Sequence, residues 1–210
     1  MTLYLPRAFD ERDLSRLDAL AVEHPFATLV TVVDDEPFVS HVPLLYSRDG
    51  NRVELRGHVA RANPQWRGGG RALAVLHGPH GYVSPAWYPD KLEQARVPTW
   101  NYVVAHLSGA LNTFDDEASL AQLVGELSER HEAAVGSDWR FNPGVDAERV
   151  QLRGIVGFRL VVDRLALKAK LNQNHPPRNR EAVAARLEAL DDSARGVARW
   201  MRAVNCIEGA

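Results

Sequence analysis

The chain has 210 residues, with 25 basic and 27 acidic side chains and a formal net charge of −2 at pH 7. This balance argues against a strongly basic nucleic-acid-binding protein, and no apolar run approaches the roughly 20 residues of a membrane span. The first residues lack the pattern of a signal peptide, so we expect a soluble protein in the cytoplasm. Because Cys206 is the single cysteine, an intramolecular disulfide and a cysteine metal cluster are excluded.

The first half of the chain predicts a helix followed by three strands. Residues 10–23 carry apolar side chains at helical spacing, and Pro25 ends this pattern. Three runs rich in β-branched and aromatic residues follow, separated by short polar turns. These expected strands are 26–33, 38–47 and 52–58. Short turns between successive strands are typical of a meander, so we expect the three strands to pair in sequence.

The second half predicts three further strands, which differ in length. They are expected at 72–77, at 99–111 and at 155–165, the last running on toward Lys170. Residues 78–90 contain three prolines and two glycines, which favour an ordered loop over a long element.

The helices of the second half show clearer signals. Acidic residues in its first turn make 115–135 the clearest helix of the chain. A short helix is expected at 146–153, and two helices are expected in 181–204 with a break at 191–193.

About six antiparallel strands with helices before, between and after them indicate an α+β, mainly β fold. We interpret this pattern as an antiparallel barrel decorated by helices, because a doubly wound sheet would alternate strand and helix from the start. The helices in 181–204 are the one candidate helix-turn-helix. Their turn lacks the usual glycine and acidic residues dilute their arginines, so we expect an amphipathic packing tail, and DNA binding is not supported.

A candidate anion site directly follows the third strand. Asn63 and Pro64 have the order of a helix N-cap and first helical position. Such a helix end offers backbone N–H groups and a partial positive charge, and Arg61 adds a planar fork of donors. His58 and Gln65 flank the same stretch. The hypothesis is a bound phosphate group; the alternative is a plain helix cap beside a solvated Arg61 and a packed His58.

Several histidines lie on or beside the expected strands and raise the alternative of a metal or haem site. They are His41, His58, His77, His80 and His106. No pair has compact i, i+4 helical spacing or a matching carboxylate pattern, so hydrogen-bonded core positions explain them better. The acidic and histidine side chains in 129–132 are likewise better explained as a solvated helix face.

Spaced motifs along the chain resemble those of a known protein family. In chain order they are PFATLVT (25–31), SHVPLL (40–45), GHVARANPQW (57–66), GPHGYVSPAWYP (78–89), VPTWNY (97–102), LSERHE (127–132), IVGF (155–158) and KLNQN (170–174). Together they resemble the PaiB family, the FMN-binding negative transcriptional regulators. The chain departs from the family pattern at Asn172, where Ser is usual, and at 179–183, where a Gly is common.

The resemblance implies a split β-barrel of the pyridoxamine-phosphate-oxidase-like superfamily that forms a homodimer and binds FMN at the subunit interface. It also implies a regulatory role, the repression of degradative-enzyme and sporulation genes in spore-forming bacteria. We expect the FMN-binding barrel in residues 1–175, including the inserted helix 115–135, and a helical tail in 176–210.

The chemistry of FMN and the resemblance together suggest which side chains contact the cofactor. The expected contacts are Ser40, His41, Val42, Pro43, Leu44, His58, Arg61, Asn63, Gln65, Trp100, Asn101, Lys170, Asn172, Gln173 and Asn174. Arg61, the amides of 63–65 and His58 are assigned to the phosphate, and 40–44 to the ring. The residues from Trp100 onward are expected to reach the flavin across the dimer interface.

Two other functions remain open from the sequence. An FMN-dependent oxidoreductase acting on a small molecule needs positioned donors more than an acid–base pair, so the lack of an obvious pair does not exclude it. A haem-binding split barrel is a weaker alternative, motivated by the strand histidines.

Overall fold

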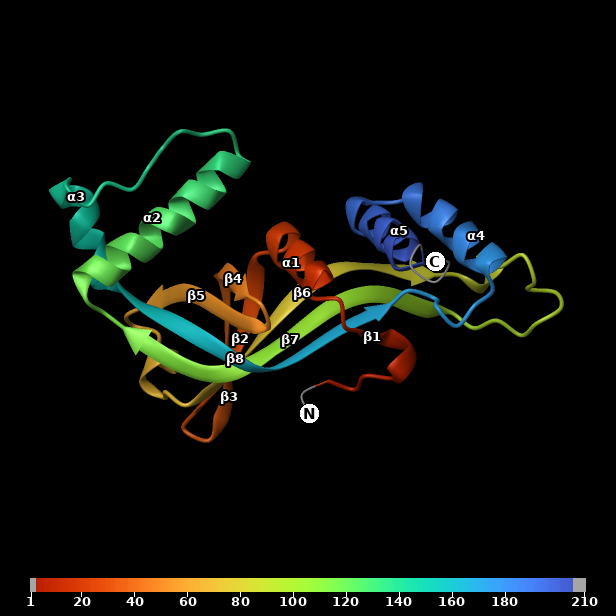
Figure 1. Ribbon diagram of the computed structural model, residues 1–210, viewed down its shortest axis with the longest axis horizontal. Helices are drawn as coiled ribbons and strands as arrows, with labels where there is room; N and C mark the ends of the chain where they lie inside the picture. Colours follow the sequence, from red (N-terminus) through yellow and green to blue (C-terminus); the bar gives the residue numbers. More distant parts are fainter. Residues whose placement is uncertain (1–2, 206–210) are drawn as a thin grey trace. The chain divides into compact units, whose positions relative to one another are not determined.

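The computed structural model describes residues 3–205, which form five α-helices and an eight-stranded antiparallel sheet (Figure 1). The strands are β1 (Asp10–Glu11), β2 (Phe26–Val33), β3 (Glu36–Pro43), β4 (Leu45–Asp49), β5 (Arg52–Ala60), β6 (Arg71–Val83), β7 (Thr99–Phe114) and β8 (Ile155–Lys170). The α-helices are α1 (Leu14–Glu23), α2 (Glu117–Ala134), α3 (Asp146–Arg149), α4 (Pro177–Glu188) and α5 (Asp192–Asn205). Short 3-10 helices are η1 (Arg7–Phe9), η2 (Pro64–Arg67), η3 (Pro85–Trp87) and η4 (Val150–Gly154).

The strands of the sheet follow the order β3-β2-β6-β7-β8-β5-β4, and β1 pairs with β8. Because β3 and β4 stand at opposite ends of this order, the sheet is not closed. This open antiparallel sheet with accompanying helices confirms the expected split barrel, with eight strands in place of about six.

The expected strand 38–47 is two strands, and this part of the prediction was wrong. β3 pairs with β2, whereas β4 pairs with β5. The change of partner falls at Leu44, whose N–H donates to the carbonyl of Pro25 at 2.9 Å. Pro43 directly before it has no N–H for a ladder, so it is suited to the end of a strand.

A two-residue turn joins β2 to β3 and confirms the expected hairpin. Asp34 and Asp35 both have positive φ, 51° and 64°, as a type I′ turn requires. Aspartate tolerates this conformation better than most non-glycine residues, which explains why two acidic residues can form so tight a connection.

The described chain forms two compact units, and three of its strands contribute to both. The terminal unit consists of residues 3–13, 77–105 and 166–205, and the central unit of 14–76 and 106–165. The divisions fall within β6, β7 and β8. Helices α4 and α5 share the terminal unit with parts of these strands; the expected domain boundary at residue 175 stays a prediction.

The core of the central unit follows the period-two alternation of its strands. Along β5, Val53, Leu55, Gly57 and Val59 are buried while the residues between them are half-buried. Helix α1 adds Leu17 and Leu20, which are completely buried. Alternation of this kind is what an antiparallel sheet with one covered face requires.

Helix α2 packs on the central unit through an apolar cluster. Its Leu123 and Leu127 join Leu45 of β4, and Phe114 at the end of β7 packs against them. Asp116 caps the helix by accepting a hydrogen bond from the Ser119 N–H at 2.9 Å. The cap and the acidic first turn confirm the expected helix.

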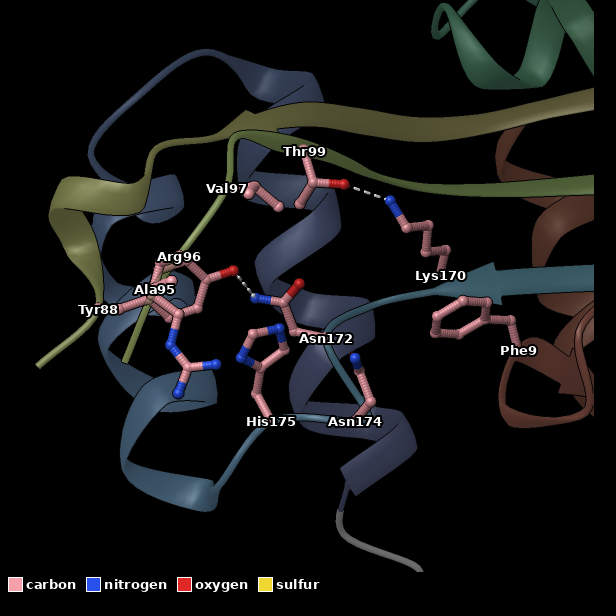
Figure 2. A pocket seen from close by; sticks show the side chains of 10 residues that line it. All are labelled: Phe9, Tyr88, Ala95, Arg96, Val97, Thr99, Lys170, Asn172, Asn174 and His175. Carbon is pink, nitrogen blue, oxygen red and sulfur yellow. Dashed lines mark hydrogen bonds between the residues drawn. The ribbon is translucent and has the colours of Figure 1, made fainter. Parts of the chain in front are cut away.

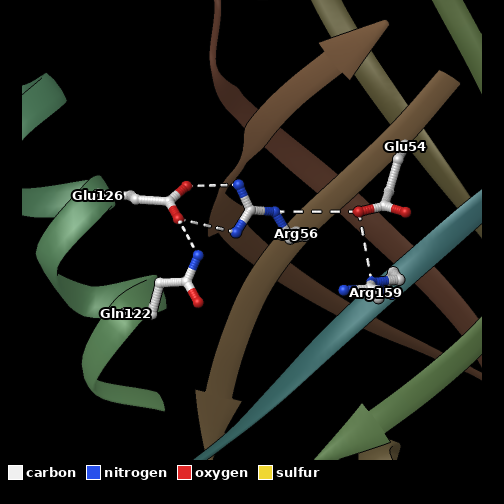
Figure 3. Close-up of polar contacts among 5 residues, drawn as sticks. All are labelled: Glu54, Arg56, Gln122, Glu126 and Arg159. Atoms are coloured by element: carbon white, nitrogen blue, oxygen red, sulfur yellow. Dashed lines mark hydrogen bonds and ion pairs between the residues drawn. The ribbon is translucent and has the colours of Figure 1, made fainter. Parts of the chain in front are cut away.

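Polar contacts link α2 to β5, and β5 in turn to β8 (Figure 3). Arg56 on β5 donates to both carboxylate oxygens of Glu126. Gln122, one turn earlier on α2, donates to the same carboxylate at 2.9 Å. On the other side, Glu54 lies 3.3 Å from Arg159 of β8. Each partly exposed pair stabilises modestly, but together they fix the helix in register with the sheet.

In the terminal unit, α4 and α5 pack on residues 77–83 of β6. A Cβ added to Gly81 would lie 3.1 Å from Leu187 of α4, and one added to Gly196 of α5 would lie 2.7 Å from Pro79. The predicted loop at 78–90 is therefore wrong for its first part, which continues β6. Contact with the helices explains why this glycine- and proline-containing stretch remains extended.

Candidate functional site

The turn after β5 has the local structure expected from Asn63 and Pro64. Asn63 Oδ1 accepts a hydrogen bond from the Gln65 N–H at 2.9 Å, and Pro64 opens η2. The capped helix is thus present, but it is a four-residue 3-10 helix.

Side-chain amides tie this turn to the neighbouring hairpin. Asn63 Nδ2 donates to the Ser40 hydroxyl at 2.8 Å. Gln65 is buried, and its Nε2 donates to the carbonyls of Leu29 at 3.1 Å and Phe38 at 3.2 Å. Gln65 Oε1 has no hydrogen-bond partner among residues 3–205. The turn is therefore held rigidly against β2 and β3.

The backbone amides of the turn are largely used within the chain. The Asn63 N–H donates to the Ala60 carbonyl at 2.9 Å, the Gln65 N–H donates to the cap, and Pro64 has none. A ligand at this turn would therefore be bound mainly by side chains.

Arg61 is oriented by the chain on three sides. Its Nε donates to the Arg153 carbonyl at 2.8 Å, its Nη2 to the Ile155 carbonyl at 3.1 Å, and its Nη1 lies 3.1 Å from Asp115 Oδ2. The guanidinium lines a cavity of about 260 Å³ that also contains Glu117. Because the Asp115 carboxylate is well exposed, a phosphate would compete with it for the same Nη1 donor.

His58 faces a less solvated environment on β5. Burial lowers the pKa of its imidazole below the ordinary value, so the ring is neutral at pH 7. Its Nδ1 atom is buried and has no partner in the described part of the chain. A buried ring nitrogen without a partner is costly, and a polar ligand group would relieve that cost.

Residues 40–44 do not share one face. Val42 and Leu44 are buried, whereas His41 is exposed, lies 3.2 Å from Thr28 Oγ1 and stacks on Phe26. Because β3 ends the strand order, alternate backbone groups along one side of it are left without a neighbouring strand. A planar ligand ring bound here would therefore contact the backbone edge of β3. It would not contact the side chains of all five residues 40–44.

The remaining expected contacts lie in the terminal unit. Trp100 is 53% exposed. The centroid of its ring lies 6.0 Å from that of His80 and 6.2 Å from that of Tyr82. Lys170 Nζ donates to the Trp100 carbonyl at 2.8 Å. Asn101 is completely buried, with its Nδ2 3.5 Å from the sulfur of Met201, so its side chain serves the packing of α5.

The polar run after β8 forms a braced turn. Asn172 has a φ of 62° and donates from Nδ2 to the Tyr88 hydroxyl at 2.9 Å. Gln173 accepts from the Leu171 N–H at 2.7 Å and donates to the carbonyl of Ala169. Two of these side chains therefore stabilise the turn itself, whereas Asn174 is exposed.

A pocket of about 300 Å³ opens beside this turn, and Figure 2 shows the side chains that line it. We call it the Lys170 pocket. It is lined by Phe9, Tyr88, Ala95, Arg96, Val97, Thr99, Lys170, Asn172, Asn174 and His175. Of these lining residues, Tyr88, Arg96 and His175 were not among the expected FMN contacts. A signal for His175 existed, since it directly follows the polar run 170–174.

No group of three or more histidine, cysteine, aspartate or glutamate side chains in residues 3–205 could hold a metal ion. None of the described helices is long and apolar enough to cross a membrane. Cys206 lies outside the described residues.

Solved structures support the class of fold. The FAD- and haem-binding protein from Mycobacterium smegmatis aligns with a TM-score of 0.59 and 21% identity, covering 84% of this chain and 79% of that one. The flavocytochrome Anf3 from Azotobacter vinelandii aligns with a TM-score of 0.58 and 18% identity, covering 79% and 72%. The chain therefore shares its split-barrel fold with these two proteins.

Sequence comparisons narrow this class to a family. A family model described as "Putative FMN-binding domain" matches residues 3–164. The "Protease synthase and sporulation protein PAI 2" of Bacillus subtilis is 30% identical over 178 residues, 82% of this chain and 83% of that protein. An uncharacterized protein of Emericella nidulans is 27% identical over 233 residues, 91% and 93% of the two chains. The chain belongs to the PaiB family of FMN-binding proteins, and its cofactor is FMN.

The side chains of the central unit fit this cofactor. FMN presents a dianionic phosphate and a ring edge that carries both acceptor atoms and an N–H donor. Arg61 supplies a positive charge, and Ser40 supplies a hydroxyl. His58 and Gln65 hold buried polar atoms without partners in residues 3–205. The assignment of individual residues to flavin atoms stays a prediction.

Proposed function

We propose that this protein is a homodimeric, FMN-binding regulator of the PaiB type, in which flavin occupancy or redox state biases a downstream interaction. The observation that carries the proposal is the Ser40–Asn63–Gln65 hydrogen-bonded cluster beside Arg61, which holds donors in place before any ligand binds. Preorganised donors reduce the entropic cost of binding.

In this proposal the phosphate of FMN binds at Arg61, with His58 and Ser40 as further donors. The ring edge lies along the backbone of β3 at residues 40–44, with Asn63 and Gln65 holding the strand and the turn together. Arg61 is suited to this task because its carbonyl contacts fix the guanidinium plane, and a planar fork binds phosphate oxygens in pairs.

The β2–β3 hairpin supports the proposed homodimer. Phe26, Val32 and Val39 are 61%, 59% and 49% exposed. The register places Val39 opposite Val30 and His41 opposite Thr28, so all these side chains lie on one face of the hairpin. Exposed apolar side chains grouped on one face are typical of a protein–protein interface.

A second subunit would complete the flavin site from its terminal unit. The candidates are Trp100, Asn101, Lys170, Asn172, Gln173 and Asn174. Trp100 and Asn174 have exposed side chains for direct contact, whereas the amides of Asn172 and Gln173 shape the turn that presents them.

The charges of α4 and α5 favour regulation without direct DNA contact by these helices. Arg202 donates to Glu188 and lies 3.0 Å from Glu181, and Arg195 pairs with Asp192. Arginines neutralised in this way contribute little to phosphate binding. We therefore propose that the regulatory role implied by the family resemblance is exerted through the flavin or through another protein.

The decisive experiment compares Arg61→Ala with Arg67→Ala in FMN titrations followed by flavin fluorescence. Arg67 is a matched control because it lies on η2 and stacks on Trp66. We expect Arg61→Ala to weaken FMN binding at least tenfold and Arg67→Ala to change it less than twofold. Equal affinities of the two variants for FMN would refute the assignment of Arg61 to the phosphate. Separately, a visible spectrum of the purified protein distinguishes bound flavin from bound haem.

A second candidate function is an FMN-dependent oxidoreductase acting on a small molecule. The Lys170 pocket favours it, because its volume of about 300 Å³ suits a small ligand. Stopped-flow mixing of the FMN-loaded protein with NADPH tests this function through bleaching of the flavin absorbance. If no pyridine nucleotide reduces the flavin, the regulatory proposal is favoured.

A further inference from the structure

Between β7 and β8 the chain leaves the sheet and returns to it within the central unit. Residues 115–154, here called the insertion, contain α2, a loop, α3 and η4 (Figure 1). The strands on either side of the insertion are neighbours in the sheet. A Cβ added to Gly157 near the start of β8 would overlap the ring of Phe114 at the end of β7. The two ends of the insertion therefore lie side by side.

Arg61 holds both of these ends. Its backbone N–H donates to the Gly154 carbonyl at 2.8 Å. Its Nε donates to the Arg153 carbonyl at 2.8 Å and its Nη2 to the Ile155 carbonyl at 3.1 Å, so the closing end is held by three hydrogen bonds. At the opening end, Nη1 donates to Asp115 Oδ2 at 3.1 Å. The side chain assigned to the FMN phosphate thus also links the two ends of the insertion.

The contacts at the two ends differ in kind. The carbonyls of 153–155 are neutral backbone groups, and Ile155 is fixed by its pairing with Ala60 of β5. Asp115 contributes a charged side chain that is 63% exposed. An exposed ion pair of this kind stabilises little, because water solvates the separated groups well. The contact with Asp115 is therefore the one that a ligand can replace.

A phosphate at Arg61 requires the positive charge that Asp115 now neutralises. Two anions on one guanidinium repel each other, and the repulsion near a protein surface is stronger than in bulk water. The cavity of about 260 Å³ beside Arg61 also contains Glu117, which lies 3.7 Å from Arg149 and adds to the negative charge there. A phosphate and the Asp115 carboxylate are consequently alternative partners of Arg61.

The position of Asp115 connects this exchange to α2. The next residue, Asp116, is the N-cap of the helix and accepts from the Ser119 N–H at 2.9 Å. Further along, α2 is held independently of Arg61, because Glu126 pairs with Arg56 and the apolar cluster of α2 packs on β4. Loss of the contact with Asp115 would therefore loosen the first turn of α2 and leave the rest of the helix in place.

We propose that Asp115 is an internal competitor of the flavin phosphate, which occupies Arg61 in the FMN-free protein and is released, together with the first turn of α2, when FMN binds. This inference deepens the proposed function and rests on its assignment of the phosphate to Arg61. The start of the insertion is then the part of the central unit that changes with FMN occupancy, and it is the surface from which a downstream partner reads that occupancy.

FMN titration of Asp115→Asn tests the competition. Asparagine keeps the size of the side chain but removes its charge, so we expect FMN to bind at least threefold more tightly than to the unsubstituted protein. The matched control is Asp146→Asn, because Asp146 is an exposed carboxylate of the same insertion that pairs with Arg149. This control should change the affinity less than twofold.

Amide hydrogen exchange, followed by mass spectrometry, tests the release of the helix start. A bound ligand normally slows exchange by stabilising the folded state. We expect the opposite for residues 115–121, whose exchange should become at least twofold faster in the FMN-loaded protein, while residues 122–130 do not become faster. In Asp115→Asn, exchange in 115–121 should be equally fast with and without FMN.

The outcomes separate this inference from the proposed function. If Arg61→Ala weakens FMN binding but Asp115→Asn does not strengthen it, the internal competitor is refuted and the phosphate assignment stands. Slower exchange in 115–121 on FMN loading would refute it equally. If Arg61→Ala leaves the affinity for FMN unchanged, the phosphate assignment fails and this inference fails with it.

Discussion

Asn63 donates a hydrogen bond to the Ser40 hydroxyl at 2.8 Å while its carbonyl oxygen caps η2 through the Gln65 N–H. One side chain thus closes the turn after β5 and ties it to β3. The two functions use different atoms of the same amide, so substitutions can separate them.

Asn63→Asp and Asn63→Ala are expected to differ in a defined way. The aspartate keeps an oxygen for the cap but cannot donate to Ser40, whereas alanine loses both contacts. We expect Asn63→Ala to lower the free energy of unfolding by about 1 kcal/mol, the usual effect of losing such a cap, and Asn63→Asp to lower it less.

FMN titration of the same two variants tests the flavin assignment. Both should weaken FMN binding: Asn63→Ala releases Ser40 and allows the turn to move relative to β3, whereas Asn63→Asp can still accept from the Ser40 hydroxyl but brings a negative charge toward the phosphate. An unchanged affinity in both variants would show that this cluster has only a structural role.

Gly109→Ala is expected to destabilise the sheet strongly. A Cβ at Gly109 on β7 would lie 1.8 Å from the carbonyl oxygen of Val161, an overlap that only backbone displacement can relieve. We expect the free energy of unfolding to fall by about 3 kcal/mol in urea titrations, at the upper end of the overpacking range.

Gly125→Ala is the matched control for this substitution. Gly125 lies within α2, and a Cβ there would meet nothing within 4 Å. Alanine is favoured over glycine in a helix interior, so stability should rise by about 1 kcal/mol. Similar losses in both variants would argue against the close approach of β7 and β8 at Gly109.

Acid sensitivity is expected at Asp90. Its ion pair with Arg96, helped by the Asn179 amide, lowers the pKa of this carboxyl from 3.8 to about 2. A carboxyl with a lowered pKa in the folded protein stabilises above its unfolded pKa, and this contribution is lost as the pH falls through the folded value. We therefore expect Asp90→Asn to lower the thermal midpoint at pH 7.

The pH dependence of this difference is the specific measurement. The gap between Asp90→Asn and the unsubstituted protein should narrow as the pH falls from about 4 toward 2. Asp163→Asn is a suitable control, because Asp163 pairs with Arg71 at an exposed position and should have a much smaller effect. A constant gap across this pH range would contradict the assignment.

The helix pair is expected not to bind DNA through Arg202. We expect gel shifts at low and moderate salt to give the same result for the unsubstituted protein and for Arg202→Ala. Glu181 and Glu188 already neutralise the Arg202 side chain, so its removal should not change any binding to DNA. The substitution should instead loosen the contact between α4 and α5, measurable as faster amide exchange. If the unsubstituted protein retarded DNA in a salt-dependent way and Arg202→Ala did not, the hypothesis of a repressor that binds DNA directly would be supported.

Part of the candidate site could be recognised in the sequence. The Asn63 cap, the proline after it and the acidic N-terminus of α2 are local signals, and each is found in the structure. Ser40 and Asn63 were both expected near FMN, but their mutual hydrogen bond joins residues far apart in the sequence. His175 was not among the expected contacts, because its stacking on the Tyr88 ring joins it to a segment distant in the sequence.

The sequence by itself determined the class of fold, the family and most helix and strand positions, because periodicity, caps and turns depend on neighbours within a few residues. Tertiary structure alone decided the division of 38–47 between β3 and β4 and the continuation of β6 through Pro79. It also decided which polar side chains are used internally and which line the Lys170 pocket. These features depend on strand partners and packed helices that are distant along the chain, and a local pattern contains no information about them.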